Sequence, residues 1–308
     1  MKSRNGSDAV NLVVVGSIAL DNIKTPSATR RCILGGSVSY ACAAASFFTC
    51  TGMVGVVGRD FPARFREAFR RFHIDQQGLQ SAAGKTFRWS GVYERNLNNR
   101  RTLFTDLNVF ADFAPDLPSA YRESPFLFLA NIAPDLQLRV LSQMHAPRFV
   151  AADTMDMWIK TTRSALLKVI SQVDMLLIND SEARELTGEE HLVHAARRML
   201  TLGPRYVIIK KGEHGSMLFS KHGLFLVPAY PVDSVQDPTG AGDAFAGGLI
   251  GMLSRARRIT PQVVRNAMVY GTMVASFAVE AFSLEKLQAI RRADIKARVH
   301  QFLRMIRC

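Results

Sequence analysis

A glycine-rich segment late in the chain, Asp237-Pro238-Thr239-Gly240-Ala241-Gly242-Asp243, has the residue types needed to bind and transfer a phosphate. It precedes an apolar stretch that predicts a helix to about Leu253. Backbone N–H groups at a helix N-terminus attract phosphate, and the small residues would let a phosphate approach closely. The segment therefore predicts an anion-binding helix N-terminus with the carboxylate of Asp243 in its first turn.

Asp243 has the chemistry of a general base. A sugar hydroxyl attacks well only when its proton has an acceptor, and an aspartate is ionised at neutral pH. Positioning and charge stabilisation would supply most of the acceleration. The chain has no G-x-x-x-x-G-K-[ST] loop, and Phe245 stands where a Rossmann fingerprint has its third glycine. The alternative is that Asp243 only complements the helix dipole.

The elements that must position this motif alternate along the chain. Apolar runs predict strands at 11–16, 51–58, 126–130, 149–152, 174–179 and 206–210. Helical spacing predicts helices at 38–48, 61–72, 135–144, 164–171, 181–187 and 193–202. This order predicts a three-layer α/β fold, with a mostly parallel sheet covered by helices on both faces. Such sheets bind ligands beyond the carboxyl ends of their strands.

One region breaks the alternation. Residues 85–95 and 100–109 both have strand character, and the asparagines at 96–99 suit a turn between them. Together with residues 23–34, this hairpin predicts a small β lid over the site; a surface hairpin without function is the alternative. The predicted division is a main α/β domain at 11–22, 35–83 and 111–308, a lid at 23–34 and 84–110, and an N-terminal tail at 1–10.

The side chains of the lid leave their role open. Phe87 and Trp89 suit stacking on a sugar or base ring, or packing between lid and body. The basic residues suit phosphate binding, but they equally suit the protection of an edge strand from aggregation. These residues are Arg88, Arg95, Arg100 and Arg101.

The segment 237–248 resembles the C-terminal signature of the ribokinase-like (PfkB) carbohydrate kinases. Further motifs of that family follow in the same order over about residues 11–285. They are Gly16 to Asp21 at the first strand end, the Gly35-Gly36 hinge, the Gly58-Arg59-Asp60 turn, the N-x-x-E motif Asn179 to Glu182, and the loop Lys210 to Gly215. The resemblance implies a kinase that uses ATP and Mg²⁺ to phosphorylate a hydroxyl of a sugar or sugar-like molecule.

The resemblance also implies roles for individual residues. Asp243 would be the catalytic base, with Gly240, Ala241 and Gly242 as the anion hole. The acceptor substrate would contact Asp21, Gly35, Gly36, Tyr40 and Asp153. ATP would contact Asn179, Glu182, Lys211, Gly212, Gly215, Thr239 and Asn266. Glu182 would act on Mg²⁺ indirectly, and Asp237 matches a position that in some members helps hold a monovalent cation such as K⁺.

Two departures from the family pattern leave the acceptor open. Tyr40 stands where many sugar kinases have a substrate-binding asparagine, and residues 153–158 lack the Asn and Arg of the family's D-x-N-x-R region. A nucleoside kinase shares the same motifs and is the alternative substrate class. A catalytically silent sugar- or nucleotide-binding regulator is a further alternative, which the presence of Asp243 argues against.

Bulk composition restricts the remaining choices. The 308 residues are 48% hydrophobic, and no uncharged apolar stretch is long enough to predict a membrane span. Four scattered cysteines and the absence of a secretory signal favour the cytoplasm. The net charge of +13 suits anionic ligands, and we interpret its basic C-terminal part as a solvated helix face in preference to a nucleic-acid surface. A homodimer through the lid is the expected assembly, if the chain assembles.

Overall fold

The computed structural model describes residues 9–97 and 99–306, and within them nine strands form one large sheet. Across the sheet the strands are β13 (Gly223–Val227), β12 (Ser216–Ser220), β11 (Tyr206–Lys210), β10 (Met175–Asn179), β9 (Phe149–Asp153), β8 (Phe126–Leu129), β1 (Leu12–Val15), β4 (Thr51–Val57) and β5 (Asp75–Ser81). Every neighbouring pair from β11 to β5 is parallel. Only the pairs β11–β12 and β12–β13 are antiparallel. The predicted mostly parallel sheet is confirmed.

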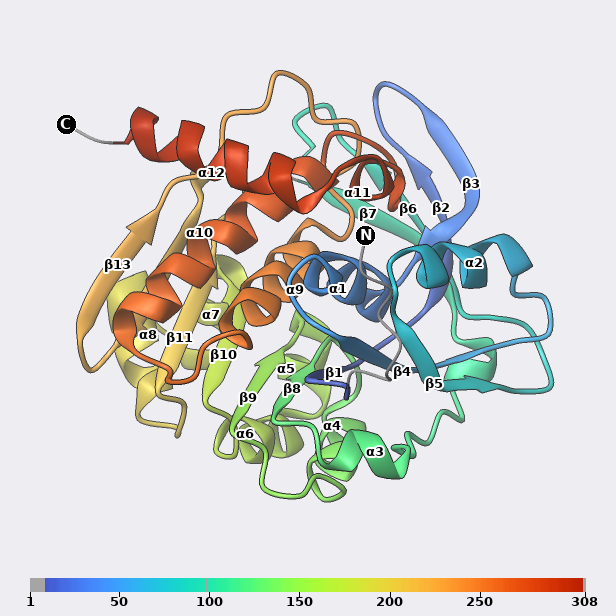
Figure 1. The fold of residues 1–308 in the computed structure, drawn as a ribbon, viewed down its shortest axis with the longest axis horizontal. Coiled ribbons are helices and arrows are strands. Elements are labelled where there is room, and N and C mark those ends of the chain that lie inside the picture. The colour runs from blue at the N-terminus through green and yellow to red at the C-terminus, as the bar shows by residue number, and fades with distance from the viewer. Residues whose placement is uncertain (1–8, 98, 307–308) are drawn as a thin grey trace.

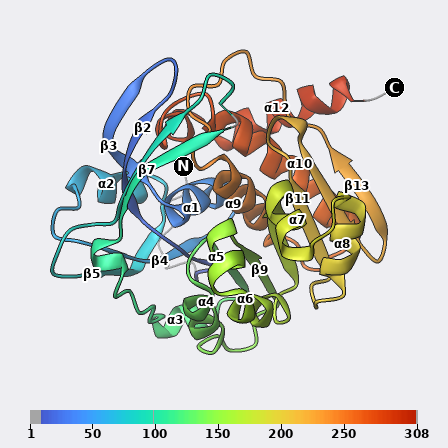
Figure 2. The same cartoon turned by 180° about the vertical axis from the view of Figure 1, so that it is seen from behind.

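Helices cover both faces of this sheet. Alternate strand residues separate into two layers, since Leu12 and Val14 of β1 join a cluster with α1 and α9, whereas Val13 and Val15 pack toward α4 and α6. One face carries α1 (Ser37–Ser46), α9 (Ala241–Leu253) and α10 (Pro261–Ala278), as Figure 1 shows. The other face, seen in Figure 2, carries α4 (Pro134–Leu141), α5 (Asp156–Thr161), α6 (Arg163–Ile170), α7 (Asp180–Thr187) and α8 (Leu192–Leu200).

The remaining helices lie around this three-layer arrangement. They are α2 (Ala63–Arg71), α3 (Ser119–Arg122), α11 (Glu285–Ala289) and α12 (Arg292–Met305). α12 packs on α10, and its apolar residues Val299 and Phe302 extend the cluster around α9. Among the helices of the described residues, none is both long enough and apolar enough to cross a membrane.

A second sheet of four strands stands at one edge of the molecule, at the upper right of Figure 1. Its order is β3 (Thr29–Gly35), β2 (Ala19–Lys24), β6 (Arg88–Tyr93) and β7 (Arg100–Asp106). The antiparallel β6–β7 pair confirms the predicted hairpin. Residues 19–22, which the sequence analysis assigns to the main domain, are strand residues of this small sheet. The division into a main domain and a lid stays a prediction.

Several elements differ from the sequence-based predictions. The strand β5 and the hairpin β12–β13 were not predicted, and helix α2 begins at Ala63, after its N-cap residue Pro62, two residues later than predicted. The predicted strands and helices otherwise match structural elements to within a few residues. Part of the predicted tail (1–8), Asn98 of the predicted turn and Cys308 lie outside the described residues.

Candidate active site

The glycine-rich segment forms the N-terminus of helix α9, as predicted. The helix begins after Gly240, whose φ of 74° lies in the left-handed region. A Cβ at Gly240 would lie 2.4 Å from the ring of Tyr40, which packs beneath it. Both the backbone turn and the aromatic ring therefore require glycine at this position. Because the first N–H groups of a helix have no intrahelical acceptor, this terminus suits a phosphate.

Asp243 lies half-buried in the first turn of α9. Burial, together with the nearby carboxylate of Asp153, raises the pKa of its carboxyl group to about 7. The positive charges of Lys210 and Arg100 oppose this rise. Asp243 therefore has the pKa expected of a base that works near neutral pH.

Lys210 is the cation at the centre of this charge cluster. Its Nζ lies 2.5 Å from Oδ2 of Asp153, and the two side chains are 18% and 4% exposed. The residues end β11 and β9, which flank β10 in the parallel sheet, so their side chains meet at the same sheet edge. Burial alone would lower the pKa of Lys210, but the carboxylates of Asp153 and Glu182 outweigh it and raise this pKa. Lys210 also reaches α9, because a Cβ on Gly242 would lie 3.4 Å from its Nζ.

The N-x-x-E motif forms a capping box at the start of α7. The backbone N–H of Glu182 donates to Oδ1 of Asn179 over 2.7 Å, and the N–H of Asn179 donates to Oε2 of Glu182 over 2.9 Å. Burial raises the pKa of Glu182 to about 7, with Lys210 opposing the rise. The motif thus has a structural role in positioning Glu182 at the carboxyl end of β10.

Asp21 occupies a second part of the site, on β2. Its Oδ1 is buried without a hydrogen-bond partner among the described residues, and a Cβ on Gly35 would lie 1.8 Å from its Oδ2. Gly35 is therefore needed to leave room for this carboxyl group. Burial, with smaller contributions from the carboxylates of Asp237 and Asp243, raises the pKa of Asp21 to about 8 against the opposing charge of Arg100. These interactions place Asp21 near the start of α9.

Tyr40 and Asp237 also have buried atoms that lack a partner within the described chain. These atoms are the hydroxyl oxygen of Tyr40 and Oδ2 of Asp237, whereas Oδ1 of Asp237 accepts from the backbone N–H of Thr239 over 2.9 Å. Burial raises the pKa of Tyr40, and the charges of Asp237 and Asp21 add to this effect. An unpaired buried polar atom costs about 1–3 kcal/mol, so this group of atoms suits a bound hydroxyl or cation.

A cavity of about 530 Å³ adjoins the N-terminus of α9. Its walls come from the loop after β11, the segment 229–238, helices α9 and α10, and the tip of the β6–β7 hairpin. Lining residues include Lys210, Gly212, Gly215, Tyr230, Gly242, Ala275, Asn96 and Leu97. Its volume lies within the range of small-molecule and cofactor sites.

The lid contacts the glycine-rich motif directly. The hydroxyl groups of Tyr93 on β6 and Thr239 lie 2.9 Å apart. Tyr93 also packs with Ile23 and Phe282, which joins the small sheet to the segment before α11. The lid hairpin therefore covers the start of α9.

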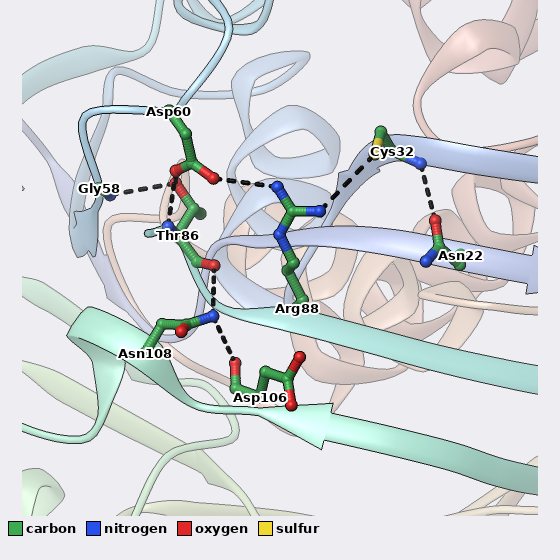
Figure 3. Close-up of polar contacts among 8 residues, drawn as sticks. All are labelled: Asn22, Cys32, Gly58, Asp60, Thr86, Arg88, Asp106 and Asn108. Carbon is green, nitrogen blue, oxygen red and sulfur yellow. Dashed lines mark hydrogen bonds and ion pairs between the residues drawn. The ribbon is translucent and has the colours of Figure 1, made fainter. Parts of the chain in front are cut away.

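The turn at residues 58–60 anchors the other end of the lid (Figure 3). One oxygen of Asp60, Oδ1, accepts from both the backbone N–H and the hydroxyl of Thr86, over 2.7 and 2.8 Å. The other oxygen, Oδ2, accepts from Arg88 over 3.0 Å, and Arg88 also reaches Sγ of Cys32 on β3. Burial opposes the shift, but these hydrogen bonds lower the pKa of Asp60. Asp60 thus fixes the point where the chain enters β6.

Magnesium fits the chemistry of the oxygen atoms near Lys210. Among the described residues, no group of three His, Cys, Asp or Glu side chains forms a ready-made metal site. Mg²⁺ is commonly held by one or two carboxylates together with substrate phosphates, so this arrangement is compatible with it. Glu182 and Asp153 are the carboxylates that could face such an ion.

The structure brings most of the predicted site residues to the same sheet edge and helix terminus, but not all of those predicted to contact ATP line the cavity. Gly212 and Gly215 line it, and so does Lys210. Asn179, Glu182, Lys211 and Thr239 are not among the described residues that line it. Asn266 is exposed near the start of α10, whereas the cavity is lined further along this helix by residues such as Thr272 and Ala275.

The sequence analysis gave no role to Tyr93, named Lys210 only as the start of a family motif, and left Arg100 as one of four arginines that suit phosphate binding. The position of Lys210 in the sequence indicates a site residue, because it is the last residue of β11 and lies on the same strand face as Tyr206 and Ile208, which pack toward α9. The lid residues carry no such signal, because their location depends on how the small sheet docks.

Comparisons with known proteins agree with this geometry. The family model described as "pfkB family carbohydrate kinase" matches residues 10–288. A cytidine kinase of Thermococcus kodakarensis is 30% identical over 80% of this chain and 90% of its own length. An aminoimidazole riboside kinase of Salmonella typhimurium is 30% identical over 87% of this chain and 90% of its own length.

The fold itself has close structural counterparts. A ribokinase of Arabidopsis thaliana, solved with ribose and ATP, superposes with a TM-score of 0.77 at 19% identity. The superposition covers 94% of this chain and 99% of the ribokinase chain. The predicted ribokinase-like fold is thereby confirmed.

Proposed function

The chain belongs to the pfkB family of carbohydrate kinases, which are phosphotransferases with a hydroxyl acceptor, and we propose that it phosphorylates a riboside with ATP. The observation that carries this proposal is Asp243, held at the N-terminus of α9 with its pKa raised to about 7 by burial. A carboxyl group of that pKa has a substantial ionised fraction near neutral pH, and its carboxylate is basic enough to assist removal of a hydroxyl proton.

The proposed reaction transfers the γ-phosphoryl group of ATP to a hydroxyl group of the acceptor. An acceptor hydroxyl oxygen forms a bond to the γ-phosphorus of ATP, and the bond from that phosphorus to the β–γ bridging oxygen breaks. ADP leaves with the electron pair, and Asp243 takes the hydroxyl proton. Backbone N–H groups at residues 240–242 stabilise charge on the transferring group. Lys210 keeps the surrounding carboxylates from repelling the nucleotide.

Two observations support a riboside as the acceptor. Asp21, Tyr40 and Asp237 present buried atoms that lack partners within the described chain and would pair with sugar hydroxyls. The two well-covered relatives are named for cytidine and for aminoimidazole riboside, and both of these substrates contain ribose. A free sugar is the second candidate, because the same atoms would pair with its hydroxyls equally well.

Nucleotide and ions have separate places in this proposal. ATP occupies the cavity beside α9, where Gly212 and Gly215 allow close approach of the chain. Mg²⁺ neutralises charge on the phosphates when bound, and Glu182 faces it through water. The unpaired Oδ2 of Asp237 has two candidate partners, an acceptor hydroxyl and a K⁺ ion near the anion hole, and assays with and without K⁺ distinguish them.

We also propose a homodimer formed through the lid. The strand β7 is the edge of the small sheet and all of its residues are exposed. They include Leu103 and Phe104, which are 52% and 39% exposed. Light scattering of the wild type and of Leu103→Arg tests this assembly, and a monomeric wild type would exclude it.

A substrate panel tests the function. Nucleosides, other ribosides and free sugars are assayed for ADP release with ATP·Mg²⁺, with and without K⁺. We expect turnover of ribosides, and we expect Asp243→Asn to lower kcat at least about a hundredfold with ATP affinity nearly unchanged. Turnover restricted to free sugars would support the second candidate. ATP binding without turnover of any acceptor would instead support a silent regulator, and an unchanged kcat in Asp243→Asn would remove the proposed base.

A further inference from the structure

The basic C-terminal stretch contains one arginine that is turned into the protein. Around α12, Arg291, Arg292, Lys296 and Arg304 are exposed, as expected for a solvated helix face. Arg298 differs from them, because its side chain is only 14% exposed. It contacts α10, on which α12 lies (Figure 1). The charge of Arg298 therefore acts inside the protein and not on the basic surface.

Arg298 is bound to the end of α10 by several contacts. Its Nη1 donates to Oγ of Ser276 over 2.9 Å and lies 2.7 Å from Oε1 of Glu280. The other oxygen of Glu280, Oε2, lies 2.7 Å from Nζ of Lys286. The guanidinium carbon of Arg298 lies 3.3 Å from the ring centroid of Phe277. Because an ion pair, a hydrogen bond and a ring contact act together, the guanidinium is held in one place.

The same guanidinium contacts the wall of the nucleotide cavity. It lies 4.8 Å from the ring centroid of Tyr230, and both Tyr230 and Ser276 line that cavity. Tyr230 belongs to the segment 228–240 between β13 and α9, in which the described residues form no helix or strand. Its ring is instead held from α12, by Arg298 and by Phe302, whose ring centroid lies 6.4 Å away.

The cavity has two chemically different parts. The part at Gly242 and Lys210 offers helix N–H groups and a cation, which suit phosphates. The wall formed by residues 229–235 and α10 is mostly apolar, which suits the flat faces of a nucleobase. Its residues include Pro231, Val232, Val235 and Ala275. Tyr230 therefore lies on the wall that suits the base, and not at the reacting phosphate.

We propose that Arg298 is a positioning residue of the ATP site, which acts through Tyr230. By holding this ring at the cavity wall, Arg298 prepares the surface on which the base of ATP packs. Its charge is balanced by Glu280 and is not used on the phosphates. The C-terminal helix thereby sets the affinity for ATP without contact with the reacting atoms. This role rests on the function proposed above, because it takes the cavity to be the ATP site.

Calorimetric titration of the full-length chain with ATP·Mg²⁺, without any acceptor, tests this role. We expect Arg298→Met to raise the Kd for ATP about tenfold, because the ring of Tyr230 is then no longer held. In steady-state kinetics with the acceptor found in the substrate panel, the KM for ATP should rise by the same factor. The kcat and the KM for the acceptor should stay within about twofold of the wild type, since the acceptor side is not touched.

Arg292→Met is the matched control on the same helix. The guanidinium of Arg292 lies 6.0 Å from the ring centroid of Phe48, which is not among the described residues that line the cavity. This variant also loses one positive charge and one ring contact. Its Kd for ATP should stay within about twofold of the wild type.

A double-mutant cycle tests whether Arg298 acts through Tyr230. Tyr230→Leu should weaken ATP binding to a similar extent, and Arg298→Met/Tyr230→Leu should weaken it no further than the stronger single change. Tyr230→Phe keeps the ring and should bind ATP within about twofold of the wild type.

The outcomes separate this role from the proposed function. A wild-type Kd in Arg298→Met, additive losses in the double variant, or a loss of kcat as large as the rise in KM would overturn the role of Arg298. In each of these cases a large loss of kcat in Asp243→Asn would leave the kinase function intact. A wild type that does not bind ATP would overturn the proposed function itself. If Arg298→Met does not fold, Arg298→Lys, which keeps a charge beside Glu280 without the planar group, replaces it under the same criteria.

Discussion

The two halves of the active site differ in how their polar groups are paired. On the proposed ATP side we place Asn179, Glu182 and Lys210, together with Asp153, which the sequence analysis assigned to the acceptor substrate. Asp153 pairs with Lys210, and Asn179 with Glu182. On the acceptor side, defined by Asp21, Tyr40 and Asp237, each residue has a buried oxygen without a partner within the described residues.

This difference suggests how the site divides its work. The ATP side is organised before any ligand arrives, because its charges are balanced by strand-end residues of a rigid parallel sheet. The acceptor side is costly in the empty protein, since each unpaired buried atom destabilises the fold by about 1–3 kcal/mol. An acceptor whose hydroxyl groups pair with those atoms removes this destabilisation, whereas an acceptor without such hydroxyl groups does not. Selectivity for the acceptor follows from that asymmetry.

The largest effect is expected from breaking the paired side. Lys210→Met would leave Asp153 buried, at 4% exposure, without its cation. Removal of one partner of a buried ion pair typically destabilises a protein by about 3–5 kcal/mol, so we expect a loss of this size together with loss of turnover. Urea unfolding and steady-state kinetics measure both quantities.

Two further variants isolate the cause of that loss. Lys211→Met removes a neighbouring positive charge that takes no part in the pair and should change the free energy of unfolding by less than about 0.5 kcal/mol. The double variant Lys210→Met/Asp153→Leu removes the stranded carboxylate and should recover part of the stability. If the double variant were less stable than the single one, the paired side would not be held by this ion pair.

On the acceptor side, removing a buried charge should instead increase the stability of the fold. Burial raises the pKa of Asp21 to about 8, so its carboxyl group favours folding when protonated, and this stability is lost as the pH rises from about 4 through 8. Asp21→Asn cannot ionise and should be more stable than the wild type at pH 8 by a few kcal/mol. The difference should shrink toward pH 5, while the variant loses affinity for the acceptor.

Asp60 provides a control, because its pKa is shifted in the opposite direction to that of Asp21. Although burial opposes it, hydrogen bonds from Thr86 and Arg88 lower the pKa of Asp60. The ionised form therefore stabilises the fold above the pKa of the unfolded chain, and Asp60→Asn should be less stable than the wild type throughout pH 5–8. Urea unfolding across this range compares the two variants. A parallel response of both would contradict the contrast between the two environments.

The paired side was only partly predictable from the sequence. The phosphate-binding turn and Asp243 are encoded locally, so residues 237–243 predict both the helix start and the carboxylate. Lys210 was named only as the start of a motif, because β11 is a continuous apolar run that does not single out one functional residue; its position as the last residue of the strand is the signal that was available. Thr272 and Ala275 of α10 were not predicted to line the cavity for a related reason, since the turn of α10 that reaches the cavity depends on how α10 packs against α9.

The lid and the sheet edges show the same limit of prediction from sequence. The β6–β7 hairpin was predicted from its alternation and turn residues, whereas the effect of the Arg100 charge on Asp243 depends on docking of the small sheet. The edge strand β5 was missed because its sequence, Asp-Gln-Gln-Gly-Leu-Gln-Ser, is mostly polar. The sequence thus predicts elements and local motifs better than contacts between distant segments.

The smallest effect concerns the capping box on the paired side. Oδ1 of Asn179 accepts from the N–H of Glu182 over 2.7 Å and from the hydroxyl of Ser181 over 2.8 Å. Asn179→Ala removes this acceptor and should lower the free energy of unfolding by about 1 kcal/mol, and the KM for ATP·Mg²⁺ should rise as Glu182 loses its position.

Asn179→Ser tests whether capping is the whole role of this residue. Serine caps helices nearly as well as asparagine and keeps the S-x-x-E form of the box, so stability and KM should both return close to wild-type values. If stability returned but KM did not, the amide of Asn179 would act on the nucleotide directly. In that case the ATP side would not be complete before its ligand binds, and the contrast with the acceptor side would be one of degree.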